Sequence, residues 1–179
     1  MSAGSTSGWS LTTFVKVQRL TPFRLRKFSS KNTSDKSSVV RQSRISSMKF
    51  SDKRLEPGTR IALRVEYDGR AFNGWQAQTK LDVPTVQEVL EAALSVIGNQ
   101  PIRTWCAGRT DTGVHASGQI VHFEDPVGRS LKSWVLGVNS ELPDTVSVHW
   151  AGSVSSEFHA RFSAVSRRYQ YIIALSLIH

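Results

Sequence analysis

From Arg60 onward, apolar and polar residues follow patterns that predict regular secondary structure. Residues 61–67 place Ile, Leu, Val and Tyr at every second position, which is the two-residue period of a half-buried strand. Asp68-Gly69 then marks a turn. Short apolar or alternating runs predict further strands at residues 102–106, 119–124 and 146–150.

Two helices are predicted between these strands. Thr85 and Glu88 have the spacing of a capping box, and apolar residues then recur at helical spacing until Gly98-Asn99 ends the helix. A second helix is expected to begin at Ser130 and to end near Pro143. The order β-α-β-β-α-β is that of a ferredoxin-like fold. We therefore expect the α+β class, with an antiparallel sheet.

Residues 167–173 predict a fifth strand that has no partner in this pattern, so we expect it to expose an open edge. Residues 1–55 differ from the rest, because they are rich in Ser, Lys and Arg and have no sustained apolar period. We expect this basic segment to be mostly disordered and residues 56–179 to form the folded domain. The segment has three candidate origins: a transit peptide, an RNA-contacting tail, or an upstream start with Met48 as the working initiator.

The net charge of +9 lies almost entirely in the N-terminal segment. Residues 1–54 hold twelve Lys and Arg against two Asp, while residues 55–179 hold eleven against twelve acidic residues. Charge alone therefore does not identify the folded part as a nucleic-acid binder. One cysteine excludes an intrachain disulfide, and no apolar run reaches the ~18 residues of a membrane span.

The loop at residues 107–115, with sequence AGRTDTGVH, carries the strongest candidate chemistry. Arg109 and Asp111 lie two residues apart, so an extended loop can present both to one cleft. A nearby guanidinium favours the ionised carboxylate, which can act as nucleophile or base. The alternative is an ordinary turn in which Asp111 caps backbone amides.

Two segments near the C-terminus combine aromatic and basic residues. In the fifth strand, Tyr169 beside Arg168 can stack a base and grip phosphates, or it can belong to a half-buried strand with a solvated basic face. His159 and Arg161 can touch RNA, or they can be surface residues between two core phenylalanines. Trp75 is interpreted as a packing aromatic. The histidines and the lone cysteine show no metal-ligand spacing, and no P-loop or dinucleotide motif occurs.

Five segments, in order, resemble the TruA family of tRNA pseudouridine synthases. They are YDG…FNGWQ, PTVQEVLE, CAGRTDTGVHASGQIVHF, GVNSELP and FHARFSAVSRRYQYII. The resemblance implies half of a pseudouridine synthase fold and the isomerisation of uridine to pseudouridine at positions 38, 39 and 40 of the tRNA anticodon stem-loop. It implies no metal and no organic cofactor, tRNA as partner, a homodimer, and a cytoplasmic enzyme. A transit peptide in residues 1–50 would instead imply a mitochondrion or plastid.

The resemblance also assigns residues. It implies that Asp111 is the catalytic aspartate, that Arg109 assists flipping of the target nucleotide and pairs with the aspartate, and that Tyr169 stacks on the base. Arg168, His159 and Arg161 are the further expected substrate contacts.

The sequence departs from the family pattern in two places. Thr112 replaces the alanine that usually follows the aspartate, and by the resemblance we expect this chain to lack the family's C-terminal half, which supplies further active-site residues. The alternative function is therefore an inactive, truncated RNA-binding fragment. An RRM module shares the element order, but residues 119–124 lack its motif.

Overall fold

The computed structural model of the chain describes residues 12–18, 50–78 and 83–172. Of residues 12–18 and Ile172, the backbone alone is described. The elements are β1 (Thr12–Gln18), β2 (Arg60–Tyr67), the 3-10 helix η1 (Gly69–Ala71), α2 (Val86–Gly98), β3 (Trp105–Cys106), β4 (His115–Glu124), α3 (Leu131–Glu141), β5 (Val146–Ser153) and β6 (Ser166–Ile172).

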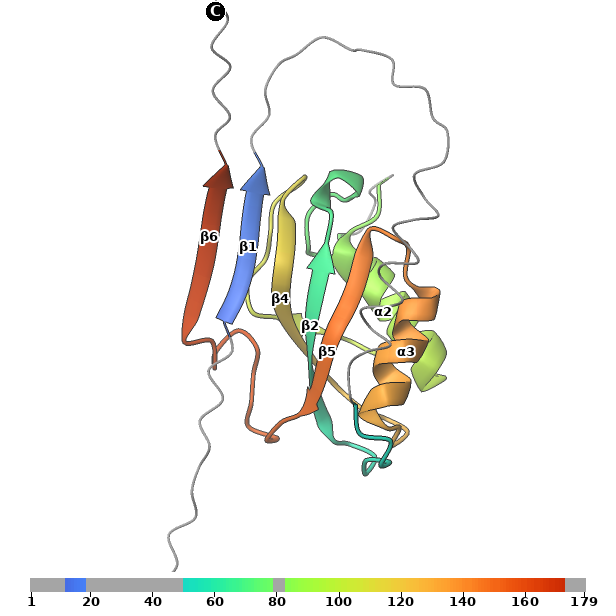
Figure 1. The fold of residues 1–179 in the computed structure, drawn as a ribbon. Helices are drawn as coiled ribbons and strands as arrows, with labels where there is room; N and C mark the ends of the chain where they lie inside the picture. Colours follow the sequence, from blue (N-terminus) through green and yellow to red (C-terminus); the bar gives the residue numbers. More distant parts are fainter. Residues whose placement is uncertain (1–11, 19–49, 79–82, 173–179) are drawn as a thin grey trace, which may run out of the picture.

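The strands form one sheet in the order β5-β2-β4-β1-β6, and β3 also pairs with β4 (Figure 1). The pairs β5–β2, β2–β4, β3–β4 and β1–β4 are antiparallel, whereas β1 and β6 run parallel. The two helices lie beside this sheet, so the expected α+β class with a mainly antiparallel sheet is confirmed.

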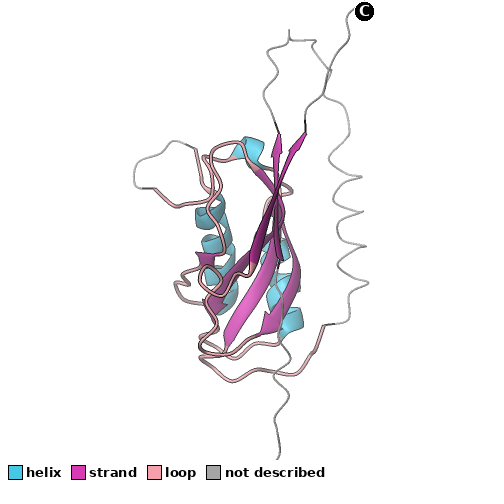
Figure 2. Cartoon of the chain, turned by 90° about the vertical axis from the view of Figure 1, so that its left-hand side faces the viewer, coloured by secondary structure: helices cyan, strands magenta, loops and turns pink. Residues whose placement is uncertain are grey.

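The main core lies between the sheet and the two helices (Figure 2). In β2, Ile61, Leu63 and Val65 are fully buried while Arg64 between them is exposed, as the alternating pattern predicts. On the helix side, Trp134 of α3 meets Phe123 of β4 edge to face, with ring centroids 4.8 Å apart. Removal of this apolar surface from water is the main force that holds the helices on the sheet.

Both predicted helix starts are confirmed. Thr85 and Glu88 form the reciprocal capping box of α2, and Ser130 caps α3 through the backbone N–H of Ser133. Asn99 ends α2 in the left-handed conformation, with φ of 54°. These signals are local in the chain, which is why the sequence shows them.

Two strand boundaries differ from expectation. β4 begins at His115 rather than Gln119, because residues 115–118 find partners in β1 and residues 116–124 find partners in β2. Residues 102–104 are not strand, because the backbone N–H of Thr104 donates to the Glu91 carboxylate instead, at 2.8 Å.

Residues 12–18, within the segment expected to be mostly disordered, form the strand β1, which inserts between β4 and β6. Val15 lies opposite Ala116 on one side and Tyr169 on the other. The fifth predicted strand, β6, therefore does have a neighbour. The physical reason is that β4 and β6 each present a row of backbone hydrogen-bonding groups, and one inserted strand satisfies both. Met48 and the rest of the segment up to residue 49 lie outside the described residues.

Candidate functional site

The loop at residues 107–114 joins β3 to β4 and exposes Asp111. Its base is fixed by the Ala107 N–H, which donates to the Ile120 carbonyl at 2.8 Å, and its tip is closed by the Val114 N–H, which donates to the Asp111 carbonyl at 3.2 Å. Within the described part of the chain, the Asp111 carboxylate accepts no hydrogen bond and forms no ion pair. The alternative in which this carboxylate caps backbone amides is therefore not observed, and neither is the expected pair with Arg109.

Two glycines let neighbouring segments support this loop at close range. A side chain at Gly69 would collide with the Val114 backbone, and the Cβ of a side chain at Gly74 would lie 2.6 Å from the Thr110 carbonyl oxygen. Gly74 also has φ of +79°, a conformation that favours glycine. The YDG and FNGW segments, through Gly69 and Gly74, therefore form part of the surface against which the loop packs.

Backbone hydrogen bonds then connect the loop to helix α2. The Trp75 N–H donates to the Thr110 carbonyl at 2.9 Å. In turn, the Val86 N–H donates to the Gly74 carbonyl at 3.1 Å and the Gln87 N–H to the Trp75 carbonyl at 3.0 Å. These N–H groups in the first turn of α2 have no partner within the helix, so residues 74–75 link the helix start to the loop.

Asp68 holds the far end of the loop. Its carboxylate accepts hydrogen bonds from the Arg70 Nε at 3.0 Å and lies 3.2 Å from the Nδ1 of His115. The hydrogen bond from Arg70, followed by the charges of Arg70 and His115, holds the pKa of Asp68 below its ordinary value. Asp68 therefore stays ionised and anchors the first residue of β4.

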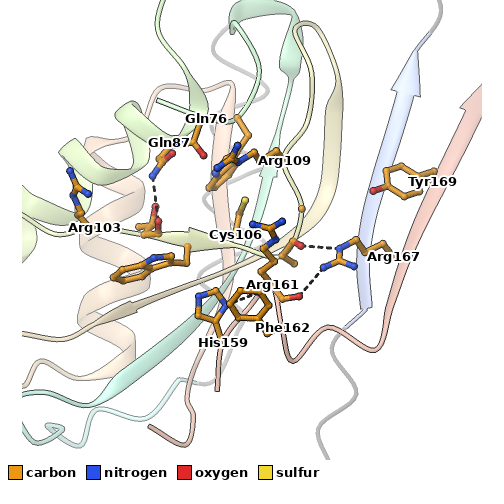
Figure 3. Close-up of a pocket in the computed structure, with 15 residues that line it drawn as sticks. Gln76, Gln87, Arg103, Cys106, Arg109, His159, Arg161, Phe162, Arg167 and Tyr169 are labelled. Atoms are coloured by element: carbon orange, nitrogen blue, oxygen red, sulfur yellow. Dashed lines mark hydrogen bonds between the residues drawn. The ribbon is translucent and has the colours of Figure 1, made fainter. Parts of the chain in front are cut away.

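Beside this loop lies an open pocket of about 800 Å³ (Figure 3). Its charged lining is entirely basic: the residues are Arg103, Arg109, Arg161 and Arg167, with no Asp or Glu among the lining side chains. Residues 55–179 therefore have nearly equal numbers of basic and acidic residues in total, but positive charge is in excess at this pocket. Such a concave basic surface attracts anions by focusing the field.

The pocket brings together four of the six predicted site residues, which are Arg109, His159, Arg161 and Tyr169. Asp111 is not among the lining residues; it is exposed two positions after Arg109 on the same loop. Arg168 is also exposed outside the lining, because side chains of adjacent residues in a strand point to opposite faces.

Arg167 joins three segments at the base of the pocket. Its Nε donates to the Ala107 carbonyl and its Nη2 to the Arg161 carbonyl, each at 2.8 Å (Figure 3). Tyr169, two residues along β6, is 51% exposed, and its hydroxyl oxygen lies 3.9 Å from where a Cβ on Gly108 would stand. This arrangement places the tyrosine ring next to the loop of Asp111.

Stacked aromatic rings form one wall of the pocket. The imidazole of His122 lies parallel to the indole of Trp105, with centroids 5.1 Å apart, and meets His159 edge-on at 4.7 Å. Burial lowers the pKa of His122 to about 4, and its Nδ1 accepts the Ala160 N–H at 3.1 Å. His122 is therefore neutral at physiological pH and fixes the segment that carries His159.

Phe158 and Phe162, which flank this segment's polar residues, were both expected in the core. Phe158 is half-buried against the His122 ring, but Phe162 is 77% exposed, so the expectation is wrong for Phe162. Phe162 instead lies over His159, with centroids 4.4 Å apart, and beside the Arg161 guanidinium at 5.7 Å. Trp75 is buried, as expected, and its edge lines the pocket.

Arg103, Trp105 and Gln87 are among the lining residues that the sequence analysis did not predict. Between Ile102 and Cys106 buried and exposed positions alternate, which leaves Arg103 and Trp105 exposed on the same face, but the sequence itself does not alternate apolar and polar residues there. Trp105 therefore remains a large exposed aromatic side chain beside Arg103.

The described residues contain no group of three or more His, Cys, Asp and Glu side chains placed to hold a metal ion. Burial raises the pKa of the Cys106 thiol to about 11, so this pocket residue is not a reactive thiolate. No helix in the described part of the chain has the length and apolar character to cross a membrane.

Fold and site together define an α+β domain in which a loop exposes a carboxylate beside a basic, aromatic-walled pocket. Comparison with known proteins adds its family. Residues 63–163 match the tRNA pseudouridine synthase family, and the chain belongs to this family.

Curated relatives agree with this assignment. The chain is 60% identical over 114 residues to tRNA pseudouridine synthase A of Photobacterium profundum, which covers 64% of this chain and 43% of that protein. The protein of the same name from Alcanivorax borkumensis is 58% identical over 115 residues, with 64% and 43% covered. That of Shigella boydii is 54% identical over 124 residues, with 69% and 45% covered. The chain thus spans less than half the length of these relatives.

Proposed function

We propose that this chain is part of an isomerase that converts uridine to pseudouridine in tRNA, at positions 38, 39 and 40 of the anticodon stem-loop. The observation that carries the proposal is the exposure of Asp111 on a braced loop, directly beside a pocket with four arginines and Tyr169. Relatives that bear the name tRNA pseudouridine synthase A match 114 and 115 residues of this chain, and the family match at residues 63–163 includes the loop of Asp111.

The proposed reaction needs only a carboxylate and a flipped nucleotide. Asp111 either attacks C1′ of the ribose or removes the proton from C2′, and the N1–C1′ bond breaks. The uracil rotates and C5 bonds to C1′; at this step the Asp111–C1′ bond of the first route breaks and frees the carboxylate, whereas in the second route Asp111 returns the proton to C2′. The C5 proton then leaves while N1 gains one, so the product is an isomer of the substrate. A stacked base hides C1′ from the carboxylate, so the nucleotide must leave the helix.

The pocket residues have roles that suit a flipped nucleotide. The half-exposed ring of Tyr169 can stack on the uracil, and Arg109 can fill the space that the base leaves. Arg161 and His159 from one segment, and Arg168 from β6, can contact the neighbouring phosphates. The Arg109 guanidinium makes no hydrogen bond or ion pair with the described residues, so it is free to meet RNA.

We also infer that residues 56–172 are half of a larger pseudouridine synthase fold with ferredoxin-like topology. The strand order β5-β2-β4, with β3 on the other side of β4, supports this inference. For the complete enzyme we propose a homodimer in the cytoplasm, or in an organelle if residues 1–50 are a transit peptide. Light scattering of the purified protein tests the dimer.

An inactive RNA-binding fragment is the second candidate function. The 43–45% coverage of the relatives favours it, because these relatives contain residues that the chain does not match. Binding without turnover would support this candidate.

The experiment that separates the two is tritium release from tRNA that carries [5-³H]uridine. Asp111→Asn keeps the size of the side chain and removes its charge, so we expect release to fall by orders of magnitude while tRNA affinity stays within about threefold. Asp52→Asn, which alters an exposed carboxylate paired with Lys132 of α3, is the control and should release tritium at the wild-type rate. More than about a tenth of wild-type release from Asp111→Asn would refute the catalytic role.

A further inference from the structure

We propose that the end of the pocket formed by Trp105 and Arg103 is a second nucleotide subsite. It would stack the base and grip the phosphate of a nucleotide next to the target uridine on the same strand. The proposal deepens the proposed function and rests on it, since it presumes an RNA substrate.

Trp105 has the geometry of a stacking platform. The imidazole of His122 lies against the indole at an interplanar angle of 19°, so this ring is held in one plane by a buried neighbour. Yet Trp105 is still 43% exposed and lines the pocket. A large aromatic ring, fixed and left open to solvent, offers a base a surface without a large loss of side-chain entropy.

The segment that carries this ring is fixed to helix α2. Thr104 donates to the Glu91 carboxylate from its backbone N–H at 2.8 Å and from its hydroxyl at 2.9 Å. The Gln87 amide, itself bonded to Glu91, donates to the Thr104 carbonyl at 3.3 Å. The indole is therefore held in place before RNA binds, which reduces the entropy cost of ordering this side chain on binding.

Arg103 and Gln76 provide unused polar groups next to the ring. Neither the Arg103 guanidinium nor the Gln76 amide makes a hydrogen bond or ion pair with any described residue. No carboxylate lines this pocket, although Arg103 also lines an adjoining smaller pocket together with Glu88 and Glu91. A guanidinium beside an aromatic platform is the combination that grips a phosphate while the base stacks.

We assign different nucleotides to the two ends of the pocket. Figure 3 shows Arg103 and Tyr169 at opposite ends, with Arg109 and Arg161 between them. The volume of about 800 Å³ lies in the upper part of the roughly 300–1,000 Å³ that ligand pockets span. With the target uridine beside Asp111 and Tyr169, the Trp105 end remains for a neighbour.

The test measures the affinity of the full chain for a fluorescent anticodon stem-loop RNA. We expect Trp105→Ala to weaken binding by about five- to a hundredfold, since a stacked base contributes that much. Trp105→Phe keeps an aromatic platform and should stay within about threefold, and Arg103→Ala should weaken binding at least about threefold. Leu136→Ala is the matched control, because Leu136 is also 43% exposed but lies on α3.

Changes in the RNA distinguish the loss of a stacked base in Trp105→Ala from a structural effect of the substitution. If Trp105 stacks on a neighbour of the target uridine, an abasic site at that neighbour weakens wild-type binding and leaves Trp105→Ala unaffected. The proposal is overturned if no single abasic site, on either side of the target, removes the difference between the two proteins. It is also overturned if Trp105→Ala binds within twofold of wild type.

These outcomes are independent of the catalytic proposal. Undiminished tritium release by Asp111→Asn would refute the role of Asp111 and leave the affinity comparison of Trp105 variants intact. Loss of turnover in Asp111→Asn together with unchanged affinity in Trp105→Ala would refute the subsite alone. No binding of the RNA by the wild-type chain would refute both.

Discussion

His122 shows how one side chain couples protonation to the arrangement of the pocket. It is 2% exposed, it stacks on Trp105, and its Nδ1 accepts the Ala160 N–H. Burial, with smaller contributions from the charges of His159 and Arg60, lowers its pKa from 6.5 to about 4. Between these two pH values the unfolded chain binds a proton that the folded chain excludes, so a fall in pH favours unfolding.

We therefore predict that His122 adds no pH dependence to the free energy of unfolding above about pH 6.5. Below that pH, protonation of His122 in the unfolded chain should lower the free energy of unfolding as the pH drops towards 4. Between pH 6.5 and 5 the His122 contribution should decrease by about 1.5 kcal/mol. Urea titrations at several pH values measure it. His122→Phe should be less stable at pH 7, because the Ala160 N–H loses its acceptor, but its stability should depend less on pH. Leu136→Ala on α3, which removes no titratable group, is the control and should keep the wild-type slope.

At the scale of elements, the loop of Asp111 depends on how closely the neighbouring turns approach it. Gly74 and Gly58 both have positive φ, of +79° and +84°, but only Gly74 faces backbone atoms, since nothing lies within 4 Å of a Cβ built at Gly58. A substitution at Gly58 therefore introduces backbone strain alone, whereas a substitution at Gly74 introduces both strain and a steric contact.

We predict that Gly58→Ala costs about 1 kcal/mol of stability, from strain alone, and leaves tritium release unchanged. Gly74→Ala should carry the same strain and also displace Thr110, so tritium release should fall at least about tenfold. Unfolding in urea gives the stabilities. Equal activity in the two variants would show that the contact at Thr110 does not position the loop.

The strand β1 affects the structure far from its own position in the sequence. In the described sheet, β6 connects to β4 only through β1. We predict that deletion of residues 1–47 leaves α2 and β2 protected against hydrogen exchange but exposes the amides of residues 166–172. Affinity for the anticodon stem-loop should also fall, since Arg167 and Tyr169 lie on β6. Unchanged protection of β6 in the deleted chain would contradict this role for β1.

The sequence predicted those parts of the fold that have local causes. The capping box at Thr85 and the alternation at residues 61–67 each act within a few neighbours, and both were confirmed. β1 was missed because its pairing with residues 115–118 and 166–172 lies about a hundred or more residues away, and no local period signals such a contact. Trp105 was missed for a similar reason, since its platform depends on His122 from another strand.

At the scale of the whole molecule, the chain covers 43–45% of relatives such as those from Photobacterium profundum and Shigella boydii. The site described here is an open pocket with an exposed Asp111. Electrostatic stabilisation of a transition state is strongest where water is excluded. The remaining length of the relatives is the natural candidate for the closing surface.

We predict that fusion of this chain to the part of the Photobacterium profundum relative that it does not match, which the family resemblance implies is the C-terminal half, gives tritium release at least about a hundredfold above that of the 179-residue chain. The same fusion with Asp111→Asn is the control and should remain at background. Equal turnover by the chain alone and by the fusion would show that the pocket needs no further closing surface.

The two-residue link between α2 and the loop has a consequence for genetics. Gly74 and Trp75 join the first turn of the helix to Thr110 through backbone atoms alone. The identities of the side chains therefore do not reveal this connection. In a saturation screen for tRNA modification, substitutions at Thr85 or Glu88 would therefore cluster with loss-of-function alleles of the Asp111 loop, although neither residue lines the pocket. Such alleles would be suppressed at low growth temperature, whereas those at Asp111 would not.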